Sequence, residues 1–199
     1  MNIFVKQATF LQPPCFFSVS NLAGKKITGI IGYIFFSVGV SYQINNSNQI
    51  NFDLIQPNED IILAFDGPSV PKTLTSFASP LTFLNEAIVH DYLYSDQSYD
   101  SIQGKNRYDF EKNSKIIWND RIRKKYADDI FNMLLSTNSV ISHIQKMMIF
   151  YSVRNFGKSS FRNKMELQRN KEVIKSYETL NYYVPKPPSD IYKKYQSFL

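Results

Sequence analysis

The sequence is short of cysteine and histidine, and each shortage excludes a class of site. Cys15 is the only cysteine in 199 residues, so the chain can form neither an intramolecular disulfide nor a cysteine-ligated zinc site. The fold must be stable without disulfides, or the protein works in a reducing compartment. Of the two histidines, His143 lies between Ser142 and Ile144 and is expected to be a surface or packing residue. A histidine-dependent site therefore has to use His90.

The sequence also lacks a long hydrophobic run. Residues 27–52 carry no charge, but their apolar part ends near Tyr42 and covers about 16 residues, whereas a membrane-spanning helix needs about 20. Residues 34–42 are rich in strand-forming side chains and partly alternate, which is typical of a half-buried strand. Residues 1–7 lack the basic-then-apolar layout of a signal peptide. We therefore expect neither a transmembrane span nor a secretion signal.

The bulk composition favours one folded domain with a basic end. Hydrophobic residues make up 43% and aromatic residues 15% of the chain, which is typical of a folded protein. We assign residues 1–157 to a single domain, because a chain of this length most simply forms one core. Residues 158–199 form a C-terminal tail with nine Lys and Arg against four acids, a net charge of +5. Such a tail suits an anionic surface, but a solvated tail that keeps the protein soluble explains the same composition.

Hydrophobic patterning divides the domain into strands followed by helices. The first part predicts four strands, near residues 3–10, 28–43, 48–55 and 60–65. Gly67 and two prolines then break regular structure. Apolar residues at helical spacing predict three helices, near residues 81–94, 118–136 and 139–156. Residues 95–117 form a long polar excursion, and Gly157 stands where a C-cap is expected. We expect an α+β fold, in which a small, mainly antiparallel N-terminal sheet precedes a three-helix core.

His90 and Asp91 are adjacent inside an apolar, helix-compatible stretch. Burying an imidazole and a carboxylate among apolar side chains is costly, so a polar pair in this setting indicates a purpose. On a helix Tyr94 lies one turn after His90 and shares its face, whereas Asp91 points about 100° away. One helix can therefore offer His90 as a base and Asp91 to a cation on the neighbouring side.

The second predicted helix carries two acids that are not equivalent. Helical phase places Asp128 at the margin of the apolar face and Asp129 on the polar side. A carboxylate that borders a core needs a partner, and His90 is the available one. We therefore expect the first two helices to be antiparallel and to carry a His-Asp pair. An Asp that binds one ring nitrogen leaves the other as a base. The same pair can instead be a structural tie between helices, and the residue types alone favour that alternative.

Four blocks of the sequence resemble, in order, the signature of domain-of-unknown-function family 1353, which is common in phages and prophages. The blocks are residues 65–72, 87–94, 127–131 and 151–157. Together they span the part of the chain from about residue 50 to residue 157. The resemblance implies a phage or prophage origin, and it implies no established activity.

The order Asp-Gly-x-Ser, His-Asp-x-x-Tyr and Asp-x-x-Phe is similar to the order of motifs in the prokaryotic branch of secreted phospholipase A2. This resemblance implies a calcium ion held by a loop and by the His-Asp pair, with Asp66, a backbone carbonyl at Gly67, and Asp91 as ligands. Hard carboxylate and carbonyl oxygens suit Ca²⁺. The ion would polarise an ester carbonyl and stabilise its oxyanion.

The same resemblance implies a catalytic set. His90 would activate water, Asp128 would orient His90, and Tyr94 would donate a hydrogen bond to Asp128. We therefore expect a phage-encoded, calcium-dependent lipid esterase or related hydrolase, in the bacterial host cytoplasm or the virion, with a lipid or envelope ester as substrate. The alternative is a non-enzymatic virion, tail or assembly protein that contacts other virion proteins. A host-directed binding protein that uses the basic tail is a third reading.

Overall fold

The structure is a computed structural model that describes residues 2–18, 30–45, 47–57, 62–65, 79–94 and 120–157. The strands are β1 (Ile3–Ser18), β2 (Ile30–Ile44), β3 (Ile50–Ile55) and β4 (Ile62–Phe65). They precede the 3-10 helix η1 (Pro80–Phe83) and the helices α2 (Leu84–Tyr94), α5 (Asp120–Thr137) and α6 (His143–Phe156). No helix in this part of the chain has the length and apolar character needed to cross a membrane. Three segments discussed above lie outside the described residues: the break at 66–71, the excursion at 95–117 and the tail at 158–199.

β2 is the central strand of the sheet, and all described pairings are antiparallel. β1 runs along one edge of β2, from Ile3 opposite Ile44 to Ser18 opposite Gly32. β3 and β4 both pair with the other edge of β2, at different parts of its length. The prediction of a small, mainly antiparallel N-terminal sheet is therefore confirmed.

β1 continues to Ser18, well beyond the predicted end at residue 10. Pro13 and Pro14 lie inside it, although proline cannot donate a hydrogen bond to a partner strand. Within the described residues β1 pairs only with β2, so it is an edge strand, and the register shifts between Gln12 and Cys15 where the prolines lie. A shift in register at a sheet edge accommodates the prolines and lets the strand continue.

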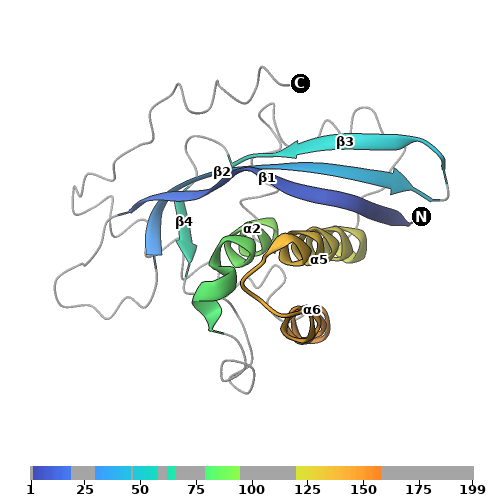
Figure 1. The fold of residues 1–199 in the computed structure, drawn as a ribbon. Coiled ribbons are helices and arrows are strands. Elements are labelled where there is room, and N and C mark those ends of the chain that lie inside the picture. Colours follow the sequence, from blue (N-terminus) through green and yellow to red (C-terminus); the bar gives the residue numbers. More distant parts are fainter. Residues whose placement is uncertain are drawn as a thin grey trace.

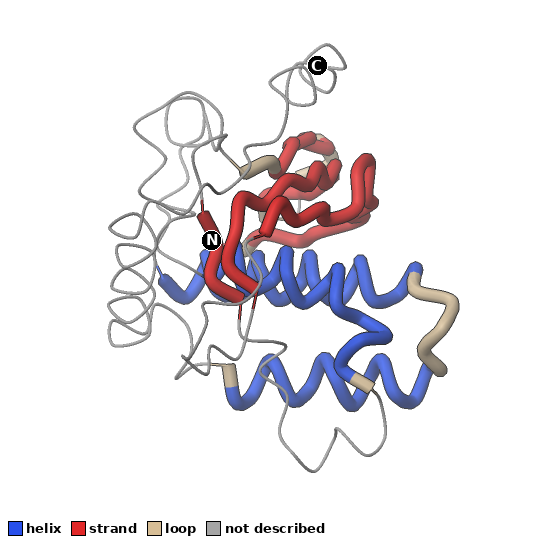
Figure 2. Tube along the Cα trace, turned by 90° about the vertical axis from the view of Figure 1, so that its left-hand side faces the viewer, coloured by secondary structure: helices blue, strands red, loops and turns tan. Residues whose placement is uncertain are grey.

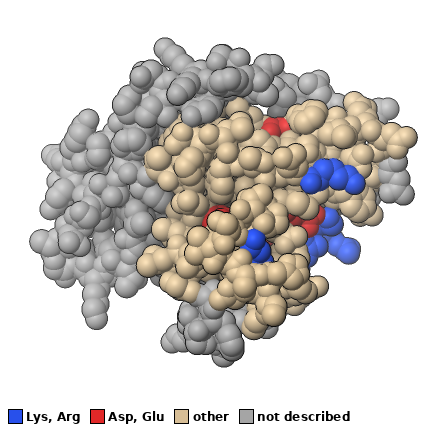
Figure 3. Space-filling model, viewed as in Figure 1, with Lys and Arg blue, Asp and Glu red and all other residues tan. Residues whose placement is uncertain are grey.

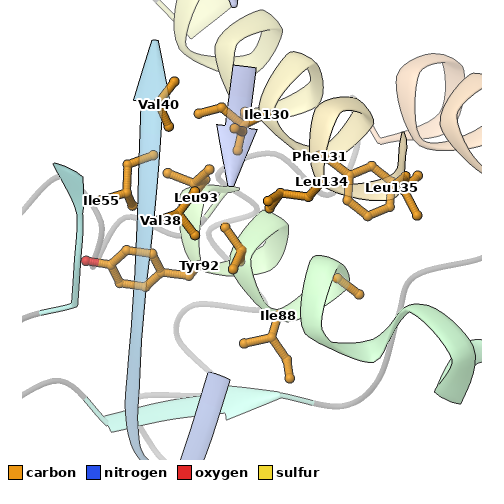
Figure 4. Packing of buried hydrophobic residues seen from close by; sticks show 14 of the residues in the cluster. Val38, Val40, Ile55, Ile88, Tyr92, Leu93, Ile130, Phe131, Leu134 and Leu135 are labelled. Atoms are coloured by element: carbon orange, nitrogen blue, oxygen red, sulfur yellow. The ribbon is translucent and has the colours of Figure 1, made fainter. Parts of the chain in front are cut away.

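The helices form two further layers against one face of the sheet. Figures 1 and 2 show α2 and α5 beneath the sheet and α6 on the side of α5 that faces away from it. Alternate side chains of β2 belong to the hydrophobic core, namely Ile34, Phe36, Val38, Val40 and Tyr42. Figure 4 shows this layer meeting side chains from α2 and α5, among them Tyr92 and Leu134. The α+β class is therefore confirmed, while the antiparallel direction of the first two helices stays a prediction.

The third helix begins at His143, later than the predicted residue 139, because the preceding turn has its own hydrogen bonds. The side-chain oxygen of Asn138 accepts from the backbone N–H of Val140 at 2.9 Å. Ser142 then caps the helix, and its side chain and that of Gln145 form a reciprocal capping box. His143 occupies the first helical position and is exposed, as expected for a surface histidine.

α6 ends at Gly157, as predicted, but a left-handed backbone is not the reason for the glycine. Its φ of −68° and ψ of −3° are right-handed. A Cβ atom at this position would lie 2.5 Å from the carbonyl oxygen of Val153 and 3.0 Å from the hydroxyl of Tyr94. The missing side chain therefore lets Tyr94, on α2, lie against the end of α6.

Replacing Gly157 with Ala should destabilise the protein by about 1–3 kcal/mol, the usual result of forcing an extra carbon into a close-packed site. Because the Cβ would meet a backbone carbonyl as well as a side chain, a rotamer change cannot remove the clash. Thermal and urea unfolding measure the effect, with Asn155→Ala on the exposed part of α6 as the control. Equal stability of the two variants would contradict the close approach of Tyr94.

Candidate functional site

His90 on α2 and Asp128 on α5 form a buried polar pair. Their exposed fractions are 6% and 1%. Nε2 of His90 lies 3.2 Å from Oδ1 of Asp128, within hydrogen-bond range. The hydroxyl of Tyr94 donates to the same oxygen. Because His90 and Tyr94 are four residues apart on one helix, both reach a single carboxylate on the neighbouring helix.

The second oxygen of Asp128 accepts from two cations. Nζ of Lys124, one turn earlier on α5, lies 2.8 Å from Oδ2, and Nη1 of Arg154 on α6 lies 3.4 Å from it. Lys124 also donates to the backbone carbonyl of Arg154 at 3.3 Å. Side chains from α2, α5 and α6 therefore converge on one buried carboxylate.

Our sequence reasoning missed both cations. Lys124 carries a sequence signal, because a residue four positions from an acid on a helix shares its face. Arg154 lies in the last sequence block described above, but helical phase gives no clue that it reaches another helix.

Asp129 lies on the outer side of α5 and is paired differently. Its side chain is 20% exposed, against 1% for Asp128, so the predicted difference between the two acids is confirmed. Lys125 forms an ion pair with Asp129 one turn away, and Arg154 Nη1 lies 3.2 Å from Asp129 Oδ1. Arg154 thus bridges the two adjacent carboxylates.

The other side of the His90 ring faces Asp91. Nδ1 of His90 lies 3.8 Å from Oδ1 of Asp91, too far for a direct hydrogen bond. The Asp91 side chain is 28% exposed, whereas the His90 side chain is 7% exposed. The imidazole packs against the rings of Tyr94 and Phe131, at centroid distances of 3.9 Å and 4.9 Å. These contacts hold the ring with Nε2 bound to Asp128 and Nδ1 facing Asp91.

Protonation of the pair follows from this environment. Burial lowers the pKa of His90, but the hydrogen bond to Asp128 and the negative charges of Asp128 and Asp91 outweigh it, so the pKa is raised above its ordinary value. Burial raises the pKa of Asp128, but hydrogen bonds from His90, Lys124 and Tyr94 and the charge of His90 lower it overall. Burial and the charge of Asp128 also raise the pKa of Tyr94, which stays a hydrogen-bond donor. The imidazolium–carboxylate form is favoured in the folded protein.

A second buried acid lies one turn before His90 on α2. Glu86 is 6% exposed, and its Oε1 accepts from Nδ2 of Asn138 at 2.9 Å. Asn138 also donates to the carbonyl of Thr82 at 2.8 Å. Burial raises the pKa of Glu86 despite hydrogen bonds and the charge of Lys146, which lower it. This contact ties the start of α2 to the turn between α5 and α6, and our sequence reasoning did not find it.

The described residues do not by themselves form a calcium site. Of the expected ligands, Asp66 and Gly67 lie outside the described residues, and Asp91 supplies one carboxylate. Among the described side chains no group of three or more His, Cys, Asp or Glu residues could hold a metal ion. One carboxylate does not meet the six to eight oxygen ligands that Ca²⁺ takes. The expected calcium site therefore stays a prediction.

The geometry defines an α+β protein in which two adjoining helices hold a buried imidazole–carboxylate pair. Residues 61–153 match the family described as "Protein of unknown function (DUF1353)". This region of the chain belongs to that family, so the predicted family is confirmed. The matched region contains His90 and Asp128 and ends one residue before Arg154. No curated protein and no solved structure matches the chain.

Replacing Asp128 with Asn should lower the pKa of His90, because burial would then be opposed by little more than Asp91. An NMR pH titration measures the change. The His143→Gln background leaves His90 as the single histidine and assigns its signal. A His90 pKa that is the same in both proteins would mean that the two side chains do not interact in solution.

The pair also makes stability depend on pH. The raised pKa of His90 gives stability that is full below its unfolded value of 6.5 and is lost as pH rises through the folded value. The lowered pKa of Asp128 gives stability that is full above its unfolded value of 3.8 and is lost as pH falls through the folded value. Between pH 3.8 and pH 6.5 the free energy of unfolding of wild type should therefore exceed that of Asp128→Asn by about 1–3 kcal/mol. In thermal melts the difference in melting temperature between the two proteins should become smaller below pH 3.8 and above pH 6.5. A difference that does not change with pH would contradict the interaction between His90 and Asp128.

Proposed function

We propose that this protein is a phage-encoded lipid esterase of the phospholipase A2-like type or a related hydrolase, acting in the bacterial host or from the virion. In this proposal His90 is the general base, and Asp128 and Tyr94 position it. Two observations support the proposal: the order of the sequence motifs, and the convergence of His90 and Tyr94 on the Asp128 carboxylate.

The orientation of the His90 ring carries the proposal. A carboxylate bound to Nε2 selects the tautomer in which Nδ1 can accept a proton. Nδ1 faces the partly exposed Asp91. In this proposal a water molecule on this side transfers a proton to Nδ1. The water oxygen would attack the ester carbonyl, and the imidazolium would return the proton to the departing alcohol. The products are a carboxylic acid and an alcohol.

The protonation state sets the working pH of this reaction. An imidazolium cannot accept a proton, and the pKa of His90 is raised above its ordinary value. Hydrolysis should therefore increase with pH through that raised pKa, so the assays should extend to pH values well above the ordinary histidine pKa of 6.5.

A second function is favoured by a different observation. Asp128 accepts from side chains of α2, α5 and α6, so the network joins three helices whether or not a reaction takes place. This arrangement suits a non-enzymatic virion, tail or assembly protein, in which the His-Asp pair is a structural tie.

His90→Asn separates the two functions. If His90 is the base, the variant should lose at least a hundredfold in ester hydrolysis, the usual contribution of general base catalysis. It should remain folded, because Asn keeps a hydrogen-bond donor. If His90 is only a tie, the variant should lose about 1–3 kcal/mol of stability and no activity should be found in either protein. Hydrolysis of ester-linked phospholipid vesicles and thermal unfolding are measured together.

His143→Asn is the matched control, because it replaces the other, exposed histidine. It should leave both readouts unchanged. Hydrolysis by wild type that survives in His90→Asn would exclude His90 as the base.

We further propose calcium as the cofactor, held by Asp91 with Asp66 and the Gly67 carbonyl. A ligand that binds only the folded protein stabilises it by about 2.7 kcal/mol at a hundredfold excess over Kd. Millimolar Ca²⁺ should therefore raise the melting temperature of wild type and leave that of Asp91→Asn unchanged.

Asp129→Asn is the control for charge. Without calcium this variant should melt at a lower temperature than wild type, because Asp129 pairs with Lys125 and Arg154. Calcium should nevertheless raise its melting temperature by the same amount as that of wild type. An absent shift in wild type, or equal shifts in all three proteins, would exclude calcium at Asp91.

A further inference from the structure

The outer surface of the α6 region carries an apolar stripe. Within the described residues nine large hydrophobic side chains are exposed, and four of them lie close together in sequence. They are Val140 (73% exposed), Ile144 (71%), Met147 (44%) and Tyr151 (55%). Ile144, Met147 and Tyr151 follow one another at intervals of three and four residues on α6, the spacing of one helix face, and Val140 lies in the turn that precedes the helix. We call these four residues the α6 stripe.

The α6 stripe lies on the face of α6 opposite the core. Ile149 is buried and Val153 packs against the core, so these residues define the inner face. On the helix Ile144, Met147 and Tyr151 fall within about 60° of one another on the outer side. Among the described helices and strands, α6 is also the layer farthest from the sheet (Figure 1). A contiguous apolar stripe at this position marks an interaction surface more often than single exposed apolar residues do.

The charged residues of α6 are basic, and a basic segment follows them. Residues 142–157 contain Lys146 and Arg154 and no Asp or Glu. Because Asp128 and Asp129 compensate Arg154, most of the positive charge is in the sequence that follows directly, residues 158–199, which has a net charge of +5. In Figure 3 the lower part of the view, where α6 lies in Figure 1, is largely uncharged. An apolar helix face that precedes a basic segment fits an anionic lipid surface.

We propose that α6 docks on an anionic lipid bilayer, with the α6 stripe inserted at the headgroup boundary and the basic sequence after α6 attracted to the lipid charge. Apolar burial and electrostatic attraction together give reversible surface binding without a spanning helix. The inference goes beyond the proposed hydrolysis, because docking requires neither His90 nor calcium.

The test is cosedimentation of the full chain with vesicles of ether-linked phosphatidylglycerol, which contains no ester to hydrolyse. Wild type should bind them at least tenfold more tightly than ether-linked phosphatidylcholine vesicles, and binding should weaken as salt increases. Ile144→Asp and Met147→Asp should each reduce binding about tenfold or more. Each change removes an apolar side chain that would be buried in the bilayer and adds a negative charge that the anionic lipid repels.

Phe52→Asp is the matched control. Phe52 lies on β3 and is 76% exposed, close to the 71% of Ile144, so the change removes a similarly exposed apolar residue and adds the same charge away from α6. Its vesicle binding should equal that of wild type. All three positions are exposed, and a thermal melt of each variant verifies that it is folded.

Three results would overturn the proposal. Equal binding to both lipid types would exclude recognition of anionic charge, and an equal loss in Phe52→Asp would exclude α6 as the docking face. In the third result Ile144→Asp leaves vesicle binding unchanged but converts a dimer into a monomer in sedimentation velocity. The α6 stripe would then contact a second copy of the chain.

Discussion

The arrangement of the helices depends on the hydrogen bonds and ion pairs that the buried Asp128 carboxylate accepts. A carboxylate that is 1% exposed is tolerated only when donors replace the lost water. His90 and Tyr94 reach it from α2, Lys124 from its own helix and Arg154 from α6. Because these donors come from three helices, satisfying this one charge fixes how α2 and α6 sit on α5.

The apolar core and the polar network hold opposite sides of the same helices. Tyr92 and Leu134 face the sheet, whereas His90 and Asp128 face each other between the helices. The core gives most of the driving force through burial, which is not directional. The hydrogen bonds are directional and therefore orient the helices relative to one another. Gly157 leaves room for Tyr94, which forms one of these hydrogen bonds. A network that stabilises helices and one that orients a catalytic imidazole need the same contacts, so the geometry alone does not distinguish the two proposed functions.

α6 connects this network to the surface. Ile149 of α6 belongs to the core and Arg154 pairs with the two adjacent acids, while the outer face of the helix carries the α6 stripe. Arg154 bears a charge that Asp128 and Asp129 already compensate, so it adds little to the external field. The basic sequence that follows α6 is the larger source of positive charge.

The sequence alone determined the element order and the α+β class, and it suggested His90 and Asp128 as partners, whose side chains lie 3.2 Å apart in the structure. Period and helical phase mark which side chains face the core, and a chain with two histidines leaves few partners for a buried acid. Only the tertiary structure decided that Lys124 and Arg154 complete the carboxylate's partners, that Gly157 is needed for packing and that the first strand continues through two prolines. Phase describes one helix at a time, whereas these features depend on how far side chains extend between separate elements.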